Sequence, residues 1–130
     1  MFIDTNIFLE IFLKDKNYIK CEEFIRDLIR KKITFYTTDY IIYSCLLIIS
    51  NKLGSSFVMR NFLIFINSIK IAIIRPSLSV LYDSIRTMKK YKLDFDDALV
   101  ISSMIENNLK ELVSYDEHFD KIKNIKIVRP

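Results

Sequence analysis

Residues 93–100 read Leu-Asp-Phe-Asp-Asp-Ala-Leu-Val and place three carboxylates directly before a helical pattern. Small and apolar side chains follow at three- and four-residue spacing, which is typical of one buried helix face: Ala98, Ile101, Ser102, Ile105 and Leu109. The acids therefore fall at the start of a helix, where free N–H groups and the helix dipole favour negative charge. One interpretation is capping alone, with Asp96 as the N-cap. The other requires carboxylates from elsewhere in the chain to lie beside Asp97.

The composition is that of a folded, mixed α/β chain. Hydrophobic residues make up 51% of the 130 residues and charged residues 28%, which excludes a disordered or fibrous protein. The length suits one domain, residues 1–130, with a substantial core. One glycine and two prolines argue against an all-β design. The net charge of +4 permits a polyanionic partner without requiring one.

Cysteine usage and the N-terminal sequence indicate a reducing compartment. Cys21 and Cys45 fall inside helical patterns and lack metal-ligand spacing, so we expect two buried free thiols, with a disulfide as the alternative. Residues 1–4 lack the basic region and cleavage site of a signal peptide. The longest apolar run, residues 40–49, is too short to span a membrane. We therefore expect a cytoplasmic protein.

Strand patterns and pairs of helical patterns alternate along the chain. The expected strands cover residues 1–3, 33–37, 70–74, 111–115 and 125–128. The expected helices cover residues 7–13, 21–32, 38–53 and 58–69, a stretch beginning at Ser77 or Ser79, and the helix after the acidic stretch. This order predicts a three-layer α/β/α sandwich with a mostly parallel central sheet.

The helix expected over residues 38–53 is apolar on nearly every side, and Ser44 is its only polar residue near the middle. A helix of this kind is buried on more than one side. We therefore expect the core on one face and a second subunit on the other, which predicts a homodimer. Gly54, the sole glycine, is expected to end this helix in a left-handed conformation.

Two further carboxylates end predicted strands. Asp4 follows the first strand and Asp116 the fourth, although Asp4 also suits a simple helix cap. Because parallel strands share one carboxyl edge, these acids and Asp97 should converge there. Adjacent like charges raise one another's pKa unless a cation neutralises them. Oxygen ligands suit Mg²⁺ or Mn²⁺, and such a centre in a basic protein fits phosphodiester hydrolysis.

Three short motifs, in this order, resemble the PIN-domain family: Asp4-Thr5-Asn6, Asp97-Ala98-Leu99 and Ser114-x-Asp116-x-x-Phe119. The resemblance spans essentially the whole chain, whose size is similar to that of small toxins of VapC type. It implies a Mg²⁺- or Mn²⁺-dependent endoribonuclease, often homodimeric, and often paired with an antitoxin protein in a type II toxin–antitoxin pair. It also implies three metal-binding, catalytic carboxylates: Asp4, Asp97 and Asp116. Asn6 and Ser114 would support the site.

Two positions depart from the family pattern. The family has a glutamate one turn into the helix after the second strand, and Ser44 stands there. His118 stands where aspartate is frequent; it suits a general base or a substrate contact, or alternatively an exposed turn histidine. With two negative charges fewer, metal affinity should fall and a second metal is doubtful. Asp94 and Asp96 are candidates to compensate, and Asp94 lies one turn before Asp97.

Two other functions merit comparison with a nuclease. A haloacid-dehalogenase-like phosphatase needs Asp-x-Asp at the first strand, and the third position here is Asn6. A catalytically reduced PIN-like module that binds RNA or a partner fits the loss of an acid at Ser44. For RNA contacts the candidates are four basic residues, whose alternative role is a solvated helix end: Arg86, Lys89, Lys90 and Lys92.

Overall fold

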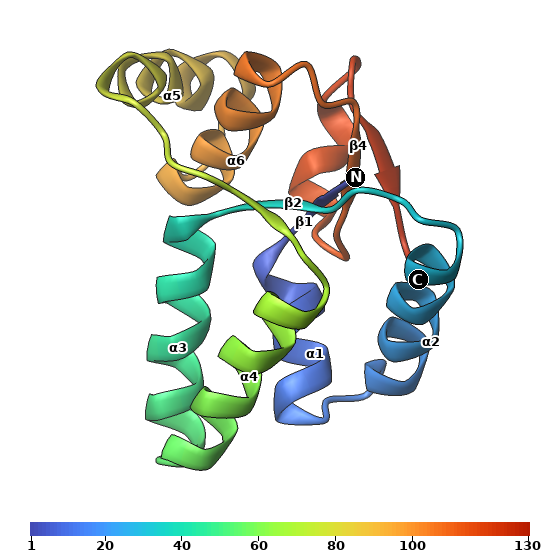
Figure 1. The fold of residues 1–130 in the computed structure, drawn as a ribbon. Coiled ribbons are helices and arrows are strands. Elements are labelled where there is room, and N and C mark those ends of the chain that lie inside the picture. The colour runs from blue at the N-terminus through green and yellow to red at the C-terminus, as the bar shows by residue number, and fades with distance from the viewer.

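The computed structural model describes residues 1–130 as strands alternating with helices (Figure 1). The strands are β1 (Phe2–Ile3), β2 (Tyr36–Thr38), β3 (Ala72–Ile74), β4 (Glu111–Val113) and β5 (Lys126–Val128). The helices are α1 (Thr5–Leu13), α2 (Tyr18–Arg30), α3 (Asp39–Leu53), α4 (Ser56–Ser68), α5 (Leu78–Tyr91), α6 (Phe95–Glu106) and the 3₁₀ helix η1 (Glu117–Lys121). The element order predicted from the sequence is confirmed.

The five strands form one sheet in the order β3-β2-β1-β4-β5, and every neighbouring pair is parallel. Helices α1 to α4 cover one face of this sheet, and α5 and α6 cover the other (Figure 1). The predicted α/β/α sandwich is therefore confirmed, and its sheet is wholly parallel. The chain leaves β1 towards β2 but leaves β4 towards β5, so the direction of strand addition reverses between β1 and β4. In open parallel sheets, ligand sites form outside the carboxyl ends of strands at such a point.

Hydroxyl side chains set the starts of the long helices, as their N-cap positions favour. Thr38 Oγ1 accepts the N–H of Ile41 at 3.2 Å at the start of α3. Ser77, rather than Ser79, caps α5 by accepting the N–H of Val80. Gly54 ends α3 with a φ of 57°, which confirms the predicted left-handed stop.

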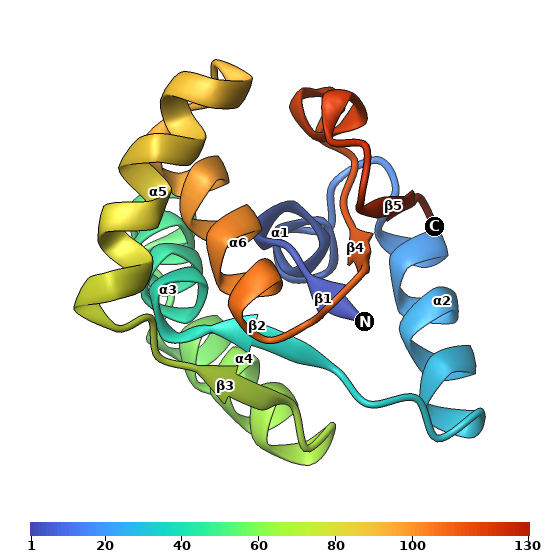
Figure 2. The ribbon, with the colours of Figure 1, turned by 90° about the horizontal axis from the view of Figure 1, so that it is seen from above.

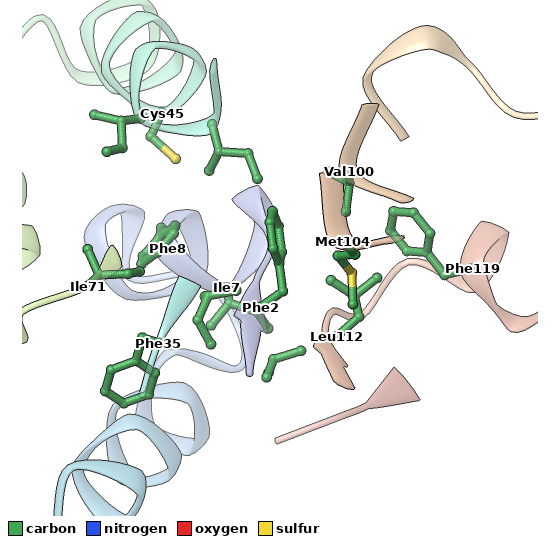
Figure 3. Packing of buried hydrophobic residues seen from close by; sticks show 14 of the residues in the cluster. Phe2, Ile7, Phe8, Phe35, Cys45, Ile71, Val100, Met104, Leu112 and Phe119 are labelled. Carbon is green, nitrogen blue, oxygen red and sulfur yellow. The ribbon is translucent and has the colours of Figure 1, made fainter. Parts of the chain in front are cut away.

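The hydrophobic core surrounds β1 on both faces of the sheet. Phe2 and Ile3 are fully buried, and Figure 3 shows Phe2 close to Ile7 of α1 and Leu112 of β4. Figure 2 shows β1 in the middle of the molecule, between β2 and β4. Because β1 is held on all sides, the residue that follows it, Asp4, has a fixed position.

The start and the burial of α6 differ from the sequence predictions. Asp94, not Asp96, is the N-cap, and its side chain makes no capping hydrogen bond; Asp96 and Asp97 lie in the first turn. Residues 98–104 are all buried, because the core covers one side of α6 and α5 covers another. Ile105, predicted to face the core, is instead 59% exposed because it lies in the last turn beyond this contact.

Two smaller predictions concern the thiols and the membrane. Cys21 and Cys45 are both buried and free, as expected. None of the helices combines the length and the apolar character that crossing a bilayer demands.

Candidate metal centre

A cleft of about 410 Å³ opens beyond the carboxyl ends of β1 and β4. Its lining contains four carboxylates, Asp4, Asp96, Asp97 and Asp116, and no basic side chain. The remaining wall is formed by α1, α3 and α6, which contribute mainly apolar side chains. The three carboxylates predicted to meet at this edge of the sheet do lie around one cleft.

Asp4 is held by the ends of two neighbouring strands. Its backbone N–H donates to the carbonyl oxygen of Val113 at 3.1 Å, and the side chain is only 7% exposed. Oδ1 accepts the N–H of Thr5 at 2.6 Å, so Asp4 caps α1. Oδ2 accepts hydrogen bonds from Asn6 Nδ2 and Ser114 Oγ, both at 2.7 Å. The Asp4 side chain therefore both caps α1 and lines the cleft.

Asn6 and Ser114 connect the two strand ends beneath Asp4. Asn6 Nδ2 also lies 2.9 Å from Ser114 Oγ, and Asn6 Oδ1 accepts the N–H of Tyr115 at 3.2 Å. Ser114 Oγ in turn accepts the backbone N–H of Asp116 at 3.0 Å. This network ties the first turn of α1 to the chain after β4 and fixes the backbone of Asp116.

Asp97 and Asp116 form the outer rim of the cleft, and the ring of His118, which does not line the cleft, lies against both. His118 Nδ1 lies 3.4 Å from Asp97 Oδ2 and 3.3 Å from Asp116 Oδ1. The side chain of Asp97 is 16% exposed, that of Asp116 33% and that of His118 65%. His118 is thus an exposed turn residue, as one interpretation of the sequence had it, and its ring also contacts two site carboxylates.

The surroundings of Asp4 and Asp97 raise the pKa of each and so favour the protonated form of these two acids. Burial raises the pKa of Asp4 to about 6, against the hydrogen bonds from Ser114 and Thr5, and the charges of Asp97 and Asp116 add to the rise. Burial also raises the pKa of Asp97 to about 6, and Asp116 adds to this shift. The cleft therefore holds more negative charge than its own side chains neutralise.

This donor set fits a divalent cation. Asp97, Asp116 and His118 each offer one ligand atom, and these atoms lie within 4.8 Å of one another. Asp4 adds a carboxylate on the inner wall. Carboxylate oxygens are the ligands that Mg²⁺ and Mn²⁺ prefer, and a cation would offset the burial and the neighbouring negative charges that raise the two pKa values.

Other residues singled out from the sequence lie inside or outside the cleft. Ser44 lines the cleft, so the position where the family has a glutamate faces the site. Of the two acids that are candidates to compensate, Asp96 lines the cleft and Asp94 does not. Because α6 starts two residues earlier than expected, Asp96 lies in its first turn, with an exposed side chain, rather than at its N-cap.

The four basic candidates lie outside the cleft lining, in the last turns of α5 and the residue after it. Arg86 forms an exposed ion pair with Asp83 at 3.1 Å. The Nζ atom of Lys121 donates to the carbonyl oxygen of Lys92, which joins η1 to the end of α5. Their part in binding RNA stays a prediction.

The sequence reasoning missed the apolar wall of the cleft. Tyr40, Leu47 and Ile48 line it from α3, on the face that also carries Ser44. Helical spacing of four, seven and eight residues from Tyr40 was the signal that these residues share one face with Ser44. The wall places an aromatic ring and aliphatic side chains beside the carboxylates.

Comparisons with known proteins agree on the family and the fold. The chain matches the family profile of the PIN domain over residues 1–125. No curated protein sequence matches it. Solved structures with the same fold include VapC20 of Mycobacterium tuberculosis, described as a sarcin–ricin loop cleaving toxin, with a TM-score of 0.81 and 13% identity over 99% of this chain and 98% of that one.

Two further solved structures share the fold. VapBC2 of Rickettsia felis, bound to a promoter DNA fragment, aligns with a TM-score of 0.78 and 17% identity over 98% of this chain and 96% of that one. A toxin–antitoxin complex of Klebsiella pneumoniae aligns with a TM-score of 0.72 and 16% identity over 98% and 94% of the two chains. At such identities the likeness concerns the fold, whereas the profile match covers nearly the whole sequence. The chain therefore belongs to the PIN-domain family.

Proposed function

We propose that this chain is a Mg²⁺- or Mn²⁺-dependent endoribonuclease that hydrolyses RNA phosphodiester bonds, with residues 1–130 acting as one domain. The observation that carries the proposal is the convergence of Asp4, Asp97 and Asp116 on one cleft of a PIN-family fold. In the proposed site these three carboxylates bind the metal and are the catalytic residues.

The residues of the proposed site have different roles. A bound divalent ion supplies an activated water and stabilises charge on the phosphoryl oxygens. Asp97 and Asp116 hold the ion at the exposed rim, while Asp4 is kept in place by Asn6 and Ser114. Because the cleft lining has no basic side chain, the phosphate has no protein cation to pair with inside it.

The walls and the rim of the cleft suit an RNA strand. Tyr40 is 39% exposed and lines the apolar wall, where an unpaired base can stack. The basic residues near the end of α5 are proposed to contact phosphates further along the strand: Arg86, Lys89, Lys90 and Lys92. Because these proposed contacts are between opposite charges, RNA binding should weaken as the salt concentration rises.

The substitution Asp97→Asn tests the nuclease function. It removes one negative ligand without changing the size of the side chain, so we expect metal-dependent cleavage of single-stranded RNA to fall by about a hundredfold or more. The matched control is Asp27→Asn, the same chemical change on an exposed residue of α2. Unchanged cleavage by a folded Asp97→Asn protein would contradict the proposal.

A catalytically reduced PIN-like module is the second candidate, and Ser44 in the cleft is the observation that favours it. A serine hydroxyl orients a water but supplies no charge to a metal site. The reduced module predicts a purified protein that binds RNA or a partner, yet neither binds Mn²⁺ nor cleaves any RNA. The nuclease predicts both metal binding and cleavage, so one purified sample separates the two.

We propose a homodimer that uses the outer face of α3. Tyr43 is 61% exposed on this otherwise apolar helix, although its neighbours Ile42 and Cys45 are buried. A second copy of the chain covering this face would bury the exposed ring. Light scattering after size-exclusion chromatography should give twice the chain mass, and Tyr43→Glu should give the single-chain mass. A single-chain mass for the unmodified protein would contradict the dimer.

We further propose that the chain is the toxin of a type II pair and is restrained by an antitoxin protein. Two of the matched structures are toxin–antitoxin complexes with the same fold. A toxin of this kind arrests growth when it is expressed alone, and the arrest depends on its site. Induced expression should therefore stop growth, and Asp97→Asn should relieve the arrest at an equal protein level.

A further inference from the structure

His118 is the only histidine in the chain, and the fold brings its ring to the two rim carboxylates. Its Nδ1 atom lies at nearly the same distance from both, 3.4 Å from Asp97 Oδ2 and 3.3 Å from Asp116 Oδ1. These two acids come from different parts of the chain, the first turn of α6 and the segment after β4. The nitrogen and the two carboxylate oxygens therefore form a triangle of possible ligand atoms.

Two sides of this triangle, from Nδ1 to the two carboxylate oxygens, are close to those of a metal site, and all three atoms lie within 4.8 Å of one another. In an octahedral centre with bonds of about 2.1 Å, neighbouring ligand atoms lie about 3.0 Å apart. The two measured separations exceed this value by only a few tenths of an ångström. A cation drawn between the three atoms would need only a small rotation of the side chains.

The backbone of η1 holds the ring in this place. Asp116 Oδ1 accepts the N–H of His118 at 2.8 Å, so one carboxylate oxygen contacts both the backbone and the ring of the same residue. The next residue, Phe119, is fully buried in the core and anchors η1. The exposed ring is therefore attached to a fixed turn rather than to a free loop.

We propose that Nδ1 of His118 is a third protein ligand of the ion held by Asp97 and Asp116, and that the site consequently prefers Mn²⁺ to Mg²⁺. This inference rests on the metal-dependent function proposed above. Imidazole nitrogen is a softer donor than carboxylate, and it suits transition ions better than Mg²⁺, which is bound through oxygen. One neutral nitrogen in place of a carboxylate also removes a charge on which a hard ion depends.

The competing role for His118 is an internal ion pair with the carboxylates. In that case a metal entering the site displaces the ring, and the nitrogen lies outside the coordination shell. Pulsed electron paramagnetic resonance of bound Mn²⁺ distinguishes the two roles, because a directly bound imidazole couples its ¹⁴N nucleus to the ion. Since the chain has no other histidine, an untagged protein in a non-coordinating buffer makes any such signal specific to His118.

The experiment compares the unmodified protein with His118→Ala, His118→Asp and the control Glu117→Gln, which alters an exposed neighbour in the same turn. We expect a ¹⁴N coupling in the unmodified protein and in Glu117→Gln, and none in either His118 variant. Calorimetric titration should show Mn²⁺ affinity about tenfold lower or more in His118→Ala. His118→Asp should retain Mn²⁺ binding while its preference for Mn²⁺ over Mg²⁺ falls about tenfold.

Two results would overturn the inference: Mn²⁺ bound without a ¹⁴N coupling, or an His118→Ala protein that binds Mn²⁺ within twofold of the original affinity. Cleavage assays on the same samples test the proposed function separately. An enzyme that cleaves RNA with Mn²⁺ but lacks the coupling refutes the ligand role alone. A protein that shows the coupling but cleaves no RNA refutes the nuclease and leaves the nitrogen ligand established.

Discussion

The inner and outer sides of the cleft hold their carboxylates by different means. On the inner side, Asp4 is 7% exposed and accepts three hydrogen bonds of 2.6 to 2.7 Å. On the outer side, Asp97 and Asp116 meet the His118 ring at 3.3 to 3.4 Å, and part of each side chain is exposed. The fold itself therefore fixes the Asp4 side chain through three short hydrogen bonds, whereas the Asp97 side chain contacts only the His118 ring.

Substitutions on the two sides of the cleft should therefore have different effects. Asp4 caps α1 and joins β1 to the chain after β4, so it contributes to the fold as well as to the site. Asp97 makes no such connection, and its raised pKa shows that its charge is unfavourable where it stands. Changes on the inner side should lower stability, and changes at Asp97 on the rim should alter metal binding and cleavage with little loss of stability.

The largest expected effect on stability comes from Ser114→Ala on the inner side. The change removes a donor to Asp4 Oδ2, takes one of its two acceptors from Asn6 Nδ2, and leaves the N–H of Asp116 without its acceptor. We expect the free energy of unfolding at pH 8 to fall by about 2 kcal/mol, measured by urea denaturation of the metal-free protein.

Two controls make this test specific. Ser114→Thr keeps the hydroxyl and should recover most of the loss, and Asp97→Asn on the rim should cost nothing or stabilise the metal-free protein. If Ser114→Ala and Asp97→Asn change the free energy of unfolding equally, the two sides of the cleft do not differ in the way described.

A smaller effect should appear in the dependence of stability on pH. The pKa of Asp4 is about 6 in the folded protein and near its ordinary value of 3.8 in the unfolded chain. A raised pKa means that this group stabilises the fold below pH 3.8 and that the contribution is lost as the pH rises through 6. Asp97, whose pKa is raised in the same direction, adds to the trend.

For Asp4 alone the loss between pH 5 and pH 8 is about 1.5 kcal/mol. Urea denaturation of the metal-free protein should therefore give a lower free energy of unfolding at pH 8 than at pH 5. Asp97→Asn should reduce the difference, since it removes one raised group and its charge on Asp4. A metal-free protein that gains stability from pH 5 to pH 8 would contradict the electrostatic description of the cleft.

The inner and outer sides of the cleft also differ in how well the sequence predicts them. Asp4 and Asp116 follow short apolar strands, and a parallel sheet leaves little freedom for where such residues lie. Their convergence was therefore predictable from element order alone. The roles of Asp4, Asp97 and Asp116 in metal binding stay predictions, because they depend on an ion rather than on the fold.

On the outer side of the cleft, the positions of the side chains depend on the identity of single residues. Three aspartates in four positions all suit an N-cap, so the sequence does not distinguish Asp94 from Asp96; the structure places Asp94 at the N-cap and Asp96 in the cleft lining. The position of the His118 ring follows from the tight turn of η1 and from the burial of Phe119. The local sequence predicts a turn at this place, but the direction of the His118 ring is set by tertiary packing.

The smallest expected effect comes from Ser44→Glu, which adds a carboxylate to the wall of α3 between the two sides. A further charged oxygen ligand should raise Mg²⁺ affinity about tenfold, measured by calorimetry, because affinity in oxygen-ligand sites follows ligand charge. Without metal, the added charge should destabilise the protein at pH 8, as it joins acids whose pKa values are already raised. Ser44→Gln has nearly the same shape without the charge and serves as the control. Equal gains from both variants would mean that side-chain size, rather than charge, limits metal binding; a gain from glutamate alone would show that the cleft binds Mg²⁺ weakly because it lacks this acid.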